Sequence, residues 1–246
     1  MRLAQALQDK HRFAGWSLVH DLGCALGNPR RAWNSLCRWG HLARCADLPY
    51  ADLVRCRREL FDDREFQHHL QRFLGDVHYT FSGLPELYAV VRVFRPRVVV
   101  ETGVASGMSS SHILRALAVN GRGELYSIDL PNVQQGSTLP RGRRTGWLVP
   151  PALRCRWRLQ LGDSRKLLPE LFPRLGGVDL FLHDSDHSYE GMTFEFEEAL
   201  PWLKRDALLL SDDIHVNHAW DNFCRRKGLR PSHVENLGIT RNRRIS

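Results

Sequence analysis

Acidic and imidazole side chains that could do chemistry gather in two short stretches near the end of the chain. HDSDH spans residues 183–187 and SDD spans residues 211–213, and each follows an apolar run that suits a strand buried in a parallel sheet. The carboxyl ends of neighbouring parallel strands meet at one edge of a sheet, so we expect Asp184, Asp212 and Asp213 to lie together. Three carboxylates in one place need a positive charge to stay ionised, and Mg²⁺ or another divalent cation would supply it.

Helix capping is the alternative explanation for these aspartates, because carboxylates that follow strands often cap the next helix. Capping accounts for one of them, but hardly for five acidic or imidazole groups at two strand ends. The sequence therefore predicts a site at this edge of the sheet.

A second stretch, RVVVETGVASGMSSS at residues 97–111, has the form of a ligand-binding strand, turn and helix. Three valines predict a buried strand, Glu101 stands where that strand would end, and Gly103 and Gly107 predict a tight turn before a helix. Backbone N–H groups at such a helix start can hold a ligand, although the same unit can also be purely structural.

The charge of this stretch indicates which cofactor it would hold. A dinucleotide fingerprint needs glycines at its first, third and sixth positions, which here are Gly103, Ala105 and Met108. Glu101 would also place a carboxylate close to any phosphate. A cationic ligand fits better, and S-adenosylmethionine carries a sulfonium and an ammonium and no phosphate. The expected cofactor-binding residues in this stretch are Glu101, Gly103, Ala105, Gly107 and Ser109.

The elements that position these residues alternate regularly from Leu84 onward. A helix is predicted over 84–94, and further strands over 123–131, 156–164, 177–188 and 206–215, with helical stretches between them. This alternation predicts an α/β fold with a doubly wound parallel sheet. Asp129 and Asp163 close the second and third strands, and a carboxylate at Asp129 could accept both ribose hydroxyls of a nucleoside.

The remaining segments flank this α/β unit. Residues 1–83 are predicted to form a helical N-terminal extension that could cap the cofactor domain of residues 84–246, with helical spacing at 51–61 and 64–74. The tail holds two short strand-like pieces around Gly238. The long Gly-, Pro- and Arg-rich connection over 132–151 is either a lid that contacts substrate or a surface insertion.

The stretch ETGVASG at 101–107 resembles motif I of the class I S-adenosylmethionine-dependent methyltransferases, which often reads E-x-G-x-x-x-G. The resemblance covers roughly residues 84–246 and implies a Rossmann-like sheet that closes with a C-terminal antiparallel hairpin. It also implies that Asp129 binds the ribose and that Asp163 sits near the adenine, although Asp163 could equally cap the helix that follows it.

The aspartate stretches resemble those of the metal-dependent O-methyltransferases, and HDSDHSYEG is closer to the sugar and natural-product branch than to the catechol branch. Carried over, the metal ligands are Asp184, Asp212 and Asp213, and the acceptor is a hydroxyl of a small molecule or sugar. The catechol-type enzymes have a catalytic lysine where this chain has His187. A hydroxyl must lose its proton before it attacks the sulfonium methyl, so a base is needed. His187 is our first choice of base and Asp186 our second.

Composition limits the other function classes. The formal net charge of +8 invites a nucleic-acid-binding module, but the basic residues are spread over all 246 residues. An NAD-dependent oxidoreductase on a similar sheet is the other alternative. No apolar run reaches the ~18–20 residues of a membrane span, and the N-terminus does not read as a secretory signal. The six cysteines form no C-x-x-C pair, which favours reduced thiols and a cytoplasmic protein. A homo-oligomer is compatible with the sequence.

Overall fold

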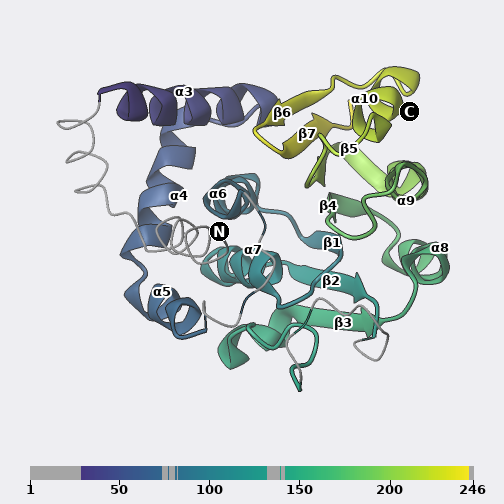
Figure 1. Cartoon of the computed structure of the whole chain (residues 1–246), viewed down its shortest axis with the longest axis horizontal. Helices are drawn as coiled ribbons and strands as arrows, with labels where there is room; N and C mark the ends of the chain where they lie inside the picture. The colour runs from purple at the N-terminus through teal and green to yellow at the C-terminus, as the bar shows by residue number, and fades with distance from the viewer. Residues whose placement is uncertain are drawn as a thin grey trace, which may run out of the picture.

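The computed structural model describes residues 29–73, 77, 81, 83–131, 139 and 142–243 (Figure 1). Its centre is a sheet whose seven strands run in the order β3-β2-β1-β4-β5-β7-β6 within this part of the chain. Strands β1 to β5 are parallel, and β7 pairs antiparallel with both β5 and β6. The strands are β1 (Val98–Thr102), β2 (Glu124–Asp129), β3 (Trp157–Leu161), β4 (Val178–His183), β5 (Leu203–Ser211), β6 (Ser232–Val234) and β7 (Leu237–Arg241).

Helices cover both faces of the sheet, so the predicted doubly wound, Rossmann-like α/β fold is confirmed (Figure 1). Alternate residues of β1 face opposite layers, because side chains of a strand alternate in direction. Val99 packs in the core with α6 and α7, whereas Val100 packs in the core with α8, α9 and α10. The helices are α3 (Pro29–Ala46), α4 (Tyr50–Asp62), α5 (Arg64–Gln71), α6 (Leu84–Phe94), α7 (Met108–Val119), α8 (Ser164–Leu175), α9 (Tyr189–Ala199) and α10 (Ala219–Arg226), with 3₁₀ turns at Pro151–Arg156 and Leu200–Trp202.

The register of the parallel strands brings their carboxyl ends to one edge. Thr102 at the end of β1 pairs with His183 at the end of β4, and His183 pairs with Ser211 at the end of β5. The residues that follow these three strands therefore start side by side, as the sequence predicted.

The N-terminal region is helical where the structure describes it, in α3, α4 and α5. Leu42 of α3 and Leu53 and Leu60 of α4 are fully or almost fully buried, in the same hydrophobic core as Tyr88 of α6 and the sheet. These helices thus share their core with the α/β unit, and a domain boundary at residue 84 stays a prediction. Residues 1–28 lie outside the described residues. None of the helices in the described ranges is long and apolar enough to cross a membrane.

The predicted closing hairpin is present, but its turn lies earlier than Gly238. β6 and β7 are joined through Glu235, which has a positive φ of 52°, and Asn236. Gly238 lies inside β7, where a Cβ atom would come within 2.7 Å of the Trp220 ring. Close packing of α10 against the strand explains this glycine, which lies inside the second of the two predicted pieces rather than between them.

Candidate active site

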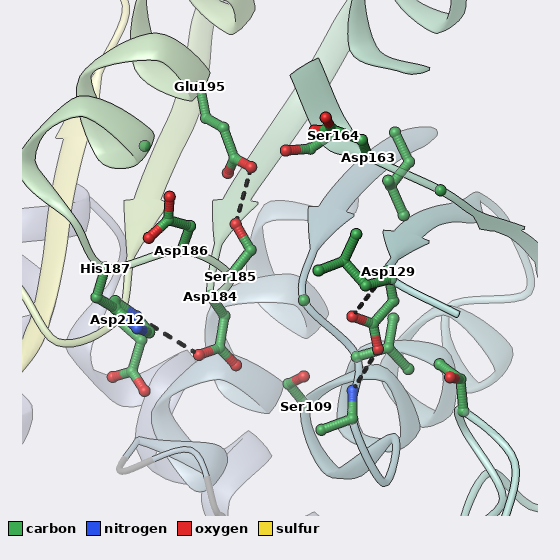
Figure 2. A pocket seen from close by; sticks show the side chains of 18 of the residues that line it. Ser109, Asp129, Asp163, Ser164, Asp184, Ser185, Asp186, His187, Glu195 and Asp212 are labelled. Atoms are coloured by element: carbon green, nitrogen blue, oxygen red, sulfur yellow. Dashed lines mark hydrogen bonds and ion pairs between the residues drawn. The ribbon is translucent and has the colours of Figure 1, made fainter. Parts of the chain in front are cut away.

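A cavity of about 790 Å³ opens at the carboxyl ends of β1, β2, β4 and β5 (Figure 2). Its volume lies in the range of sites that hold cofactors and small molecules. Most of the residues that the sequence singled out line it: Gly103, Ala105, Ser109, Asp129, Asp163, Asp184, Asp186, His187, Asp212 and Asp213. Glu101 and Gly107 are not among the lining residues.

The turn between β1 and α7, residues 103–107, forms one wall of the cavity and is called the cofactor turn below. Gly103 has a φ of 81°, and a Cβ atom there would lie 1.8 Å from the carbonyl oxygen of Asp184. The glycine is thus required by the close approach of the loop after β4. Gly107 has a φ of 91° and precedes the first residue of α7, where a Cβ atom would crowd Val149. Both glycines are therefore needed where neighbouring segments approach the turn closely.

Glu101 lies within β1, one residue before the strand ends, and its exposed fraction is 0%. Its carboxylate accepts hydrogen bonds from the hydroxyls of Ser109 and Ser110 at 2.6 Å and of Ser127 at 2.8 Å. Burial raises the pKa of Glu101 to about 7, and the serine hydroxyls oppose that rise. Glu101 therefore ties the start of α7 to β1 and β2 from beneath the cavity, without facing it.

Asp129 ends β2 and Asp163 follows the neighbouring strand β3, and both line the cavity. Asp129 Oδ2 accepts the backbone N–H of Ala105 at 2.8 Å, and its Oδ1 accepts that of Leu130 at 2.8 Å. Burial raises the pKa of Asp129 above its usual range. Asp163 accepts the backbone N–H of Arg165 at 2.9 Å as the N-cap of α8, so the capping alternative describes its contact in this structure.

Asp184, Asp212 and Asp213 all face the same cavity, as their positions after β4 and β5 predicted. Burial, followed by the charges of Asp212, Glu101 and Asp213, raises the pKa of Asp184 well above its ordinary value. Asp213 Oδ1 accepts a hydrogen bond from Asn236 at 3.1 Å, which directs it toward the β6–β7 turn. Within the described ranges, no three or more His, Cys, Asp or Glu side chains are grouped so that they could hold a metal ion.

The two candidate bases differ in their surroundings. His187 Nε2 lies 3.9 Å from Asp184 Oδ1 and makes no hydrogen bond within the described part of the chain. Burial lowers the pKa of His187, which favours the neutral imidazole that a base requires. Asp186 instead accepts the backbone N–H and the hydroxyl of Ser188, at 3.0 and 2.9 Å, before α9 begins. Its carboxylate points away from Asp184 and Asp212 (Figure 2).

Sequence reasoning missed one functional candidate, Glu195 of α9, which lines the cavity although only 1% of it is exposed. Its carboxylate accepts hydrogen bonds from Thr102 Oγ1, from His183 Nδ1 at 2.6 Å and from Ser185 Oγ at 2.8 Å. These groups come from the ends of β1 and β4 and from the loop after β4. Glu195 shares the buried helix face of Met192, a position from which it could have been identified.

Comparisons with known proteins can now be set beside this geometry. Residues 100–214 match the family model described as a methyltransferase domain. This part of the chain is a methyltransferase domain. The match and the strand order confirm the predicted class I, S-adenosylmethionine-dependent type. No curated protein matches the methyltransferase in sequence.

Solved structures of other methyltransferases share its fold at low sequence identity. An O-methyltransferase from Bacillus cereus in complex with S-adenosylhomocysteine is 12% identical, with a TM-score of 0.52 over 73% of this chain and 91% of that chain. The S-adenosylhomocysteine-bound methyltransferase PaMTH1 of Podospora anserina is 14% identical, with a TM-score of 0.54 over 75% and 89%. The O-methyltransferase TomG of Streptomyces achromogenes, in complex with S-adenosylmethionine, is 17% identical, with a TM-score of 0.51 over 72% and 88%.

Proposed function

We propose that this methyltransferase moves the methyl group of S-adenosylmethionine to a hydroxyl of a small molecule and that it uses Mg²⁺. The observation that carries the proposal is the acidic cavity, in which Asp129, Asp184 and Asp212 come from the ends of three parallel strands. Similar folds bind S-adenosylhomocysteine or S-adenosylmethionine in proteins described as O-methyltransferases, which supports the same reading here.

The cofactor would lie along the cofactor turn, with its ribose at Asp129 and its adenine toward Asp163. Each oxygen of Asp129 accepts one backbone N–H and keeps a second lone pair for a ribose hydroxyl. Burial raises the pKa of Asp129, and burial together with neighbouring carboxylates raises the pKa of Asp184, so the cavity favours a ligand that brings positive charge. A sulfonium and an ammonium group would stabilise the ionised carboxylates.

Mg²⁺ would be held by Asp184 and Asp212, with Asp213 as a third candidate ligand. Mg²⁺ binds through one or two carboxylates and completes its shell with water and substrate oxygens, so it needs no group of three protein ligands. Asp213 already accepts a hydrogen bond from Asn236 at its Oδ1. When bound, the metal would lower the pKa of the acceptor hydroxyl.

His187 would accept the proton of the acceptor hydroxyl. Its Nε2 lies beside Asp184, and the lowered pKa of His187 keeps the imidazole neutral near pH 7. Asp186 is the second candidate, but its oxygens are engaged by Ser188. The cavity walls would align the methyl group with the acceptor oxygen.

The rest of the chain would serve this reaction. Residues 84–246 would form the catalytic domain and residues 1–83 its helical cap. The acceptor would be a sugar or natural-product hydroxyl, and the enzyme would act in the cytoplasm.

Transfer of a labelled methyl group from S-adenosylmethionine to a panel of sugars, phenols and natural products tests the proposal. We expect activity on at least one hydroxyl with Mg²⁺, loss with EDTA and recovery on adding metal. Full activity in excess EDTA, in protein shown to be free of metal, would exclude the metal role. Binding of NAD but not of S-adenosylmethionine would overturn the cofactor assignment.

Two substitutions then separate the candidate bases. His187→Ala should keep cofactor binding and lose roughly 10²–10⁴-fold in rate, the usual range for a general base. Asp186→Ala should lose much less of the rate, because the Asp186 carboxylate is engaged by Ser188 before α9. The opposite ranking of the two rates would exchange the two roles.

A further inference from the structure

We propose that α5, through His69, positions the cofactor turn and thereby sets the affinity for S-adenosylmethionine. The connection runs through residues 145–149, called the support segment below, which are part of the long link between β2 and β3. The inference rests on the proposed function in one respect: the cofactor turn must be part of the cofactor site.

The support segment is hydrogen-bonded directly to the cofactor turn. The N–H of Gly146 donates to the carbonyl of Ala105 at 2.8 Å, and the N–H of Leu148 donates to the carbonyl of Ser106 at 2.9 Å. The side chain of Val149 lies against Gly107. The support segment therefore fixes the direction of two successive carbonyls of the turn.

The cofactor turn needs outside support because Ala105 has a positive φ of 46°. A residue with a Cβ atom rarely adopts this left-handed conformation, because the Cβ atom comes too close to the following carbonyl oxygen. Two hydrogen bonds hold Ala105 there, because its N–H donates to Asp129 and its carbonyl accepts from Gly146. Loss of the bond on the support-segment side would free the turn, and with it the Ala105 N–H that orients the carboxylate proposed to bind ribose.

Helix α5 holds the other side of the support segment. His69 Nε2 donates to the carbonyl of Leu148 at 2.9 Å. Leu148 therefore bridges α5 and the cofactor turn, because its carbonyl bonds to His69 and its N–H to Ser106. Phe73, just after α5, meets the ring of Trp147 edge-on at 5.4 Å, and the guanidinium of Arg143 lies 4.4 Å from the centre of that ring. These contacts fix the position of the support segment relative to the cofactor turn.

Helix α5 is itself fixed to α7, the helix that begins at the cofactor turn. Asp63, the N-cap of α5, pairs with Arg115 of α7. Phe66 of α5 packs edge-on against His112 of α7 with their ring centres 5.2 Å apart. The helix, the support segment and the cofactor turn thus form a closed chain of contacts. His69 is a positioning residue, because it is not among the residues that line the cavity.

Titration calorimetry with S-adenosylhomocysteine, well below the unfolding temperature, tests this inference. His69→Ala should raise the Kd about threefold to tenfold, the effect of one lost hydrogen bond. His69→Gln should restore most of the affinity, because the amide nitrogen of Gln can stand where Nε2 stands and donate to the Leu148 carbonyl. The exposed neighbour His68 supplies the matched control, and His68→Ala should leave the Kd unchanged.

The outcomes separate the inference from the proposed function. A wild-type chain that fails to bind S-adenosylhomocysteine would refute the cofactor site and this inference together. Normal binding by the wild type and by His69→Ala, with only a lower Tm in the variant, would refute the inference alone. Hydrogen exchange of the wild type needs no variant: the amides of Gly146 and Leu148 should gain protection on cofactor binding, and unchanged exchange at both would overturn the inference.

Discussion

Two buried glutamates at the same cavity, Glu101 beneath it in β1 and Glu195 lining it in α9, have opposite pKa shifts. Each accepts hydrogen bonds from three neighbouring side chains. The partners of Glu101 are all serine hydroxyls, and burial raises its pKa to about 7. Glu195 has the imidazole of His183 among its partners, and its pKa is lowered although burial opposes that shift.

The difference teaches which polar groups can keep a buried carboxylate ionised. Neutral hydroxyls satisfy the hydrogen bonds of Glu101 but do not repay the cost of its charge, whereas an imidazole can carry the compensating charge itself. Asp184 is a third case: burial and then neighbouring carboxylates raise its pKa, and a cation from outside the chain would complete its surroundings.

The largest effect should come from removing Glu195. Glu195→Ala leaves His183 Nδ1 and two hydroxyls without their acceptor in the protein interior. We expect a loss of about 3–5 kcal/mol in the free energy of unfolding, as for a broken buried pair. Denaturant unfolding measures this, with Glu190→Ala on the exposed side of the same helix costing under ~1 kcal/mol. Equal losses in the two variants would show that Glu195 is not held as described.

Opposite pH dependences of Glu101→Gln and Glu195→Gln sharpen the comparison. The raised pKa of Glu101 means that its contribution to the free energy of unfolding is present below pH ~4.5 and is lost as the pH rises through about 7. The wild type should therefore lose about 3 kcal/mol relative to Glu101→Gln across that range. The lowered pKa of Glu195 gives the reverse sign. The stability of the wild type should rise relative to that of Glu195→Gln as the pH rises through the ordinary range of a glutamate. Unfolding curves from pH 4 to 8 would contradict the account if both differences had the same slope.

The smallest effect is expected from two serines. At pH 6, Ser185→Ala removes a hydrogen bond to an ionised carboxylate and should cost about 1.5–3 kcal/mol. Ser110→Ala removes one to a carboxyl that is mostly protonated at that pH and should cost about 0.5–1.5 kcal/mol. The difference between the stability losses of the two variants should narrow at pH 8, where Glu101 is ionised. A difference that stays constant with pH would contradict the assigned protonation states.

The fold was largely predictable because the signals that carry it are local. The valine run before Glu101, the alternating apolar strands and the glycine turn all act within a few residues, and the predicted elements appear with shifted ends. The position of Asp184 beside Asp212 followed from strand order alone.

The contacts of individual side chains could not be predicted, since they depend on residues distant in sequence. The sequence predicts that Glu101 binds the cofactor, but its carboxylate accepts hydrogen bonds from three serines of α7 and β2. His183 looked like a member of the acidic site, yet it turns to Glu195, twelve residues later. The prediction of a lid over 132–151 falls partly on residues 132–138 and 140–141, outside the described residues, and remains a prediction.

The binding of Mn²⁺, as a spectroscopic probe for Mg²⁺, tests the central claim that a cation completes the cavity at Asp184. Electron paramagnetic resonance of the wild type with S-adenosylhomocysteine should show one Mn²⁺ per chain, displaced by excess Mg²⁺. Asp184→Asn should abolish this binding, and Asp186→Asn should retain it because that carboxylate points away from the pair (Figure 2). Absence of Mn²⁺ binding in the wild type, or equal binding in Asp184→Asn, would contradict the account.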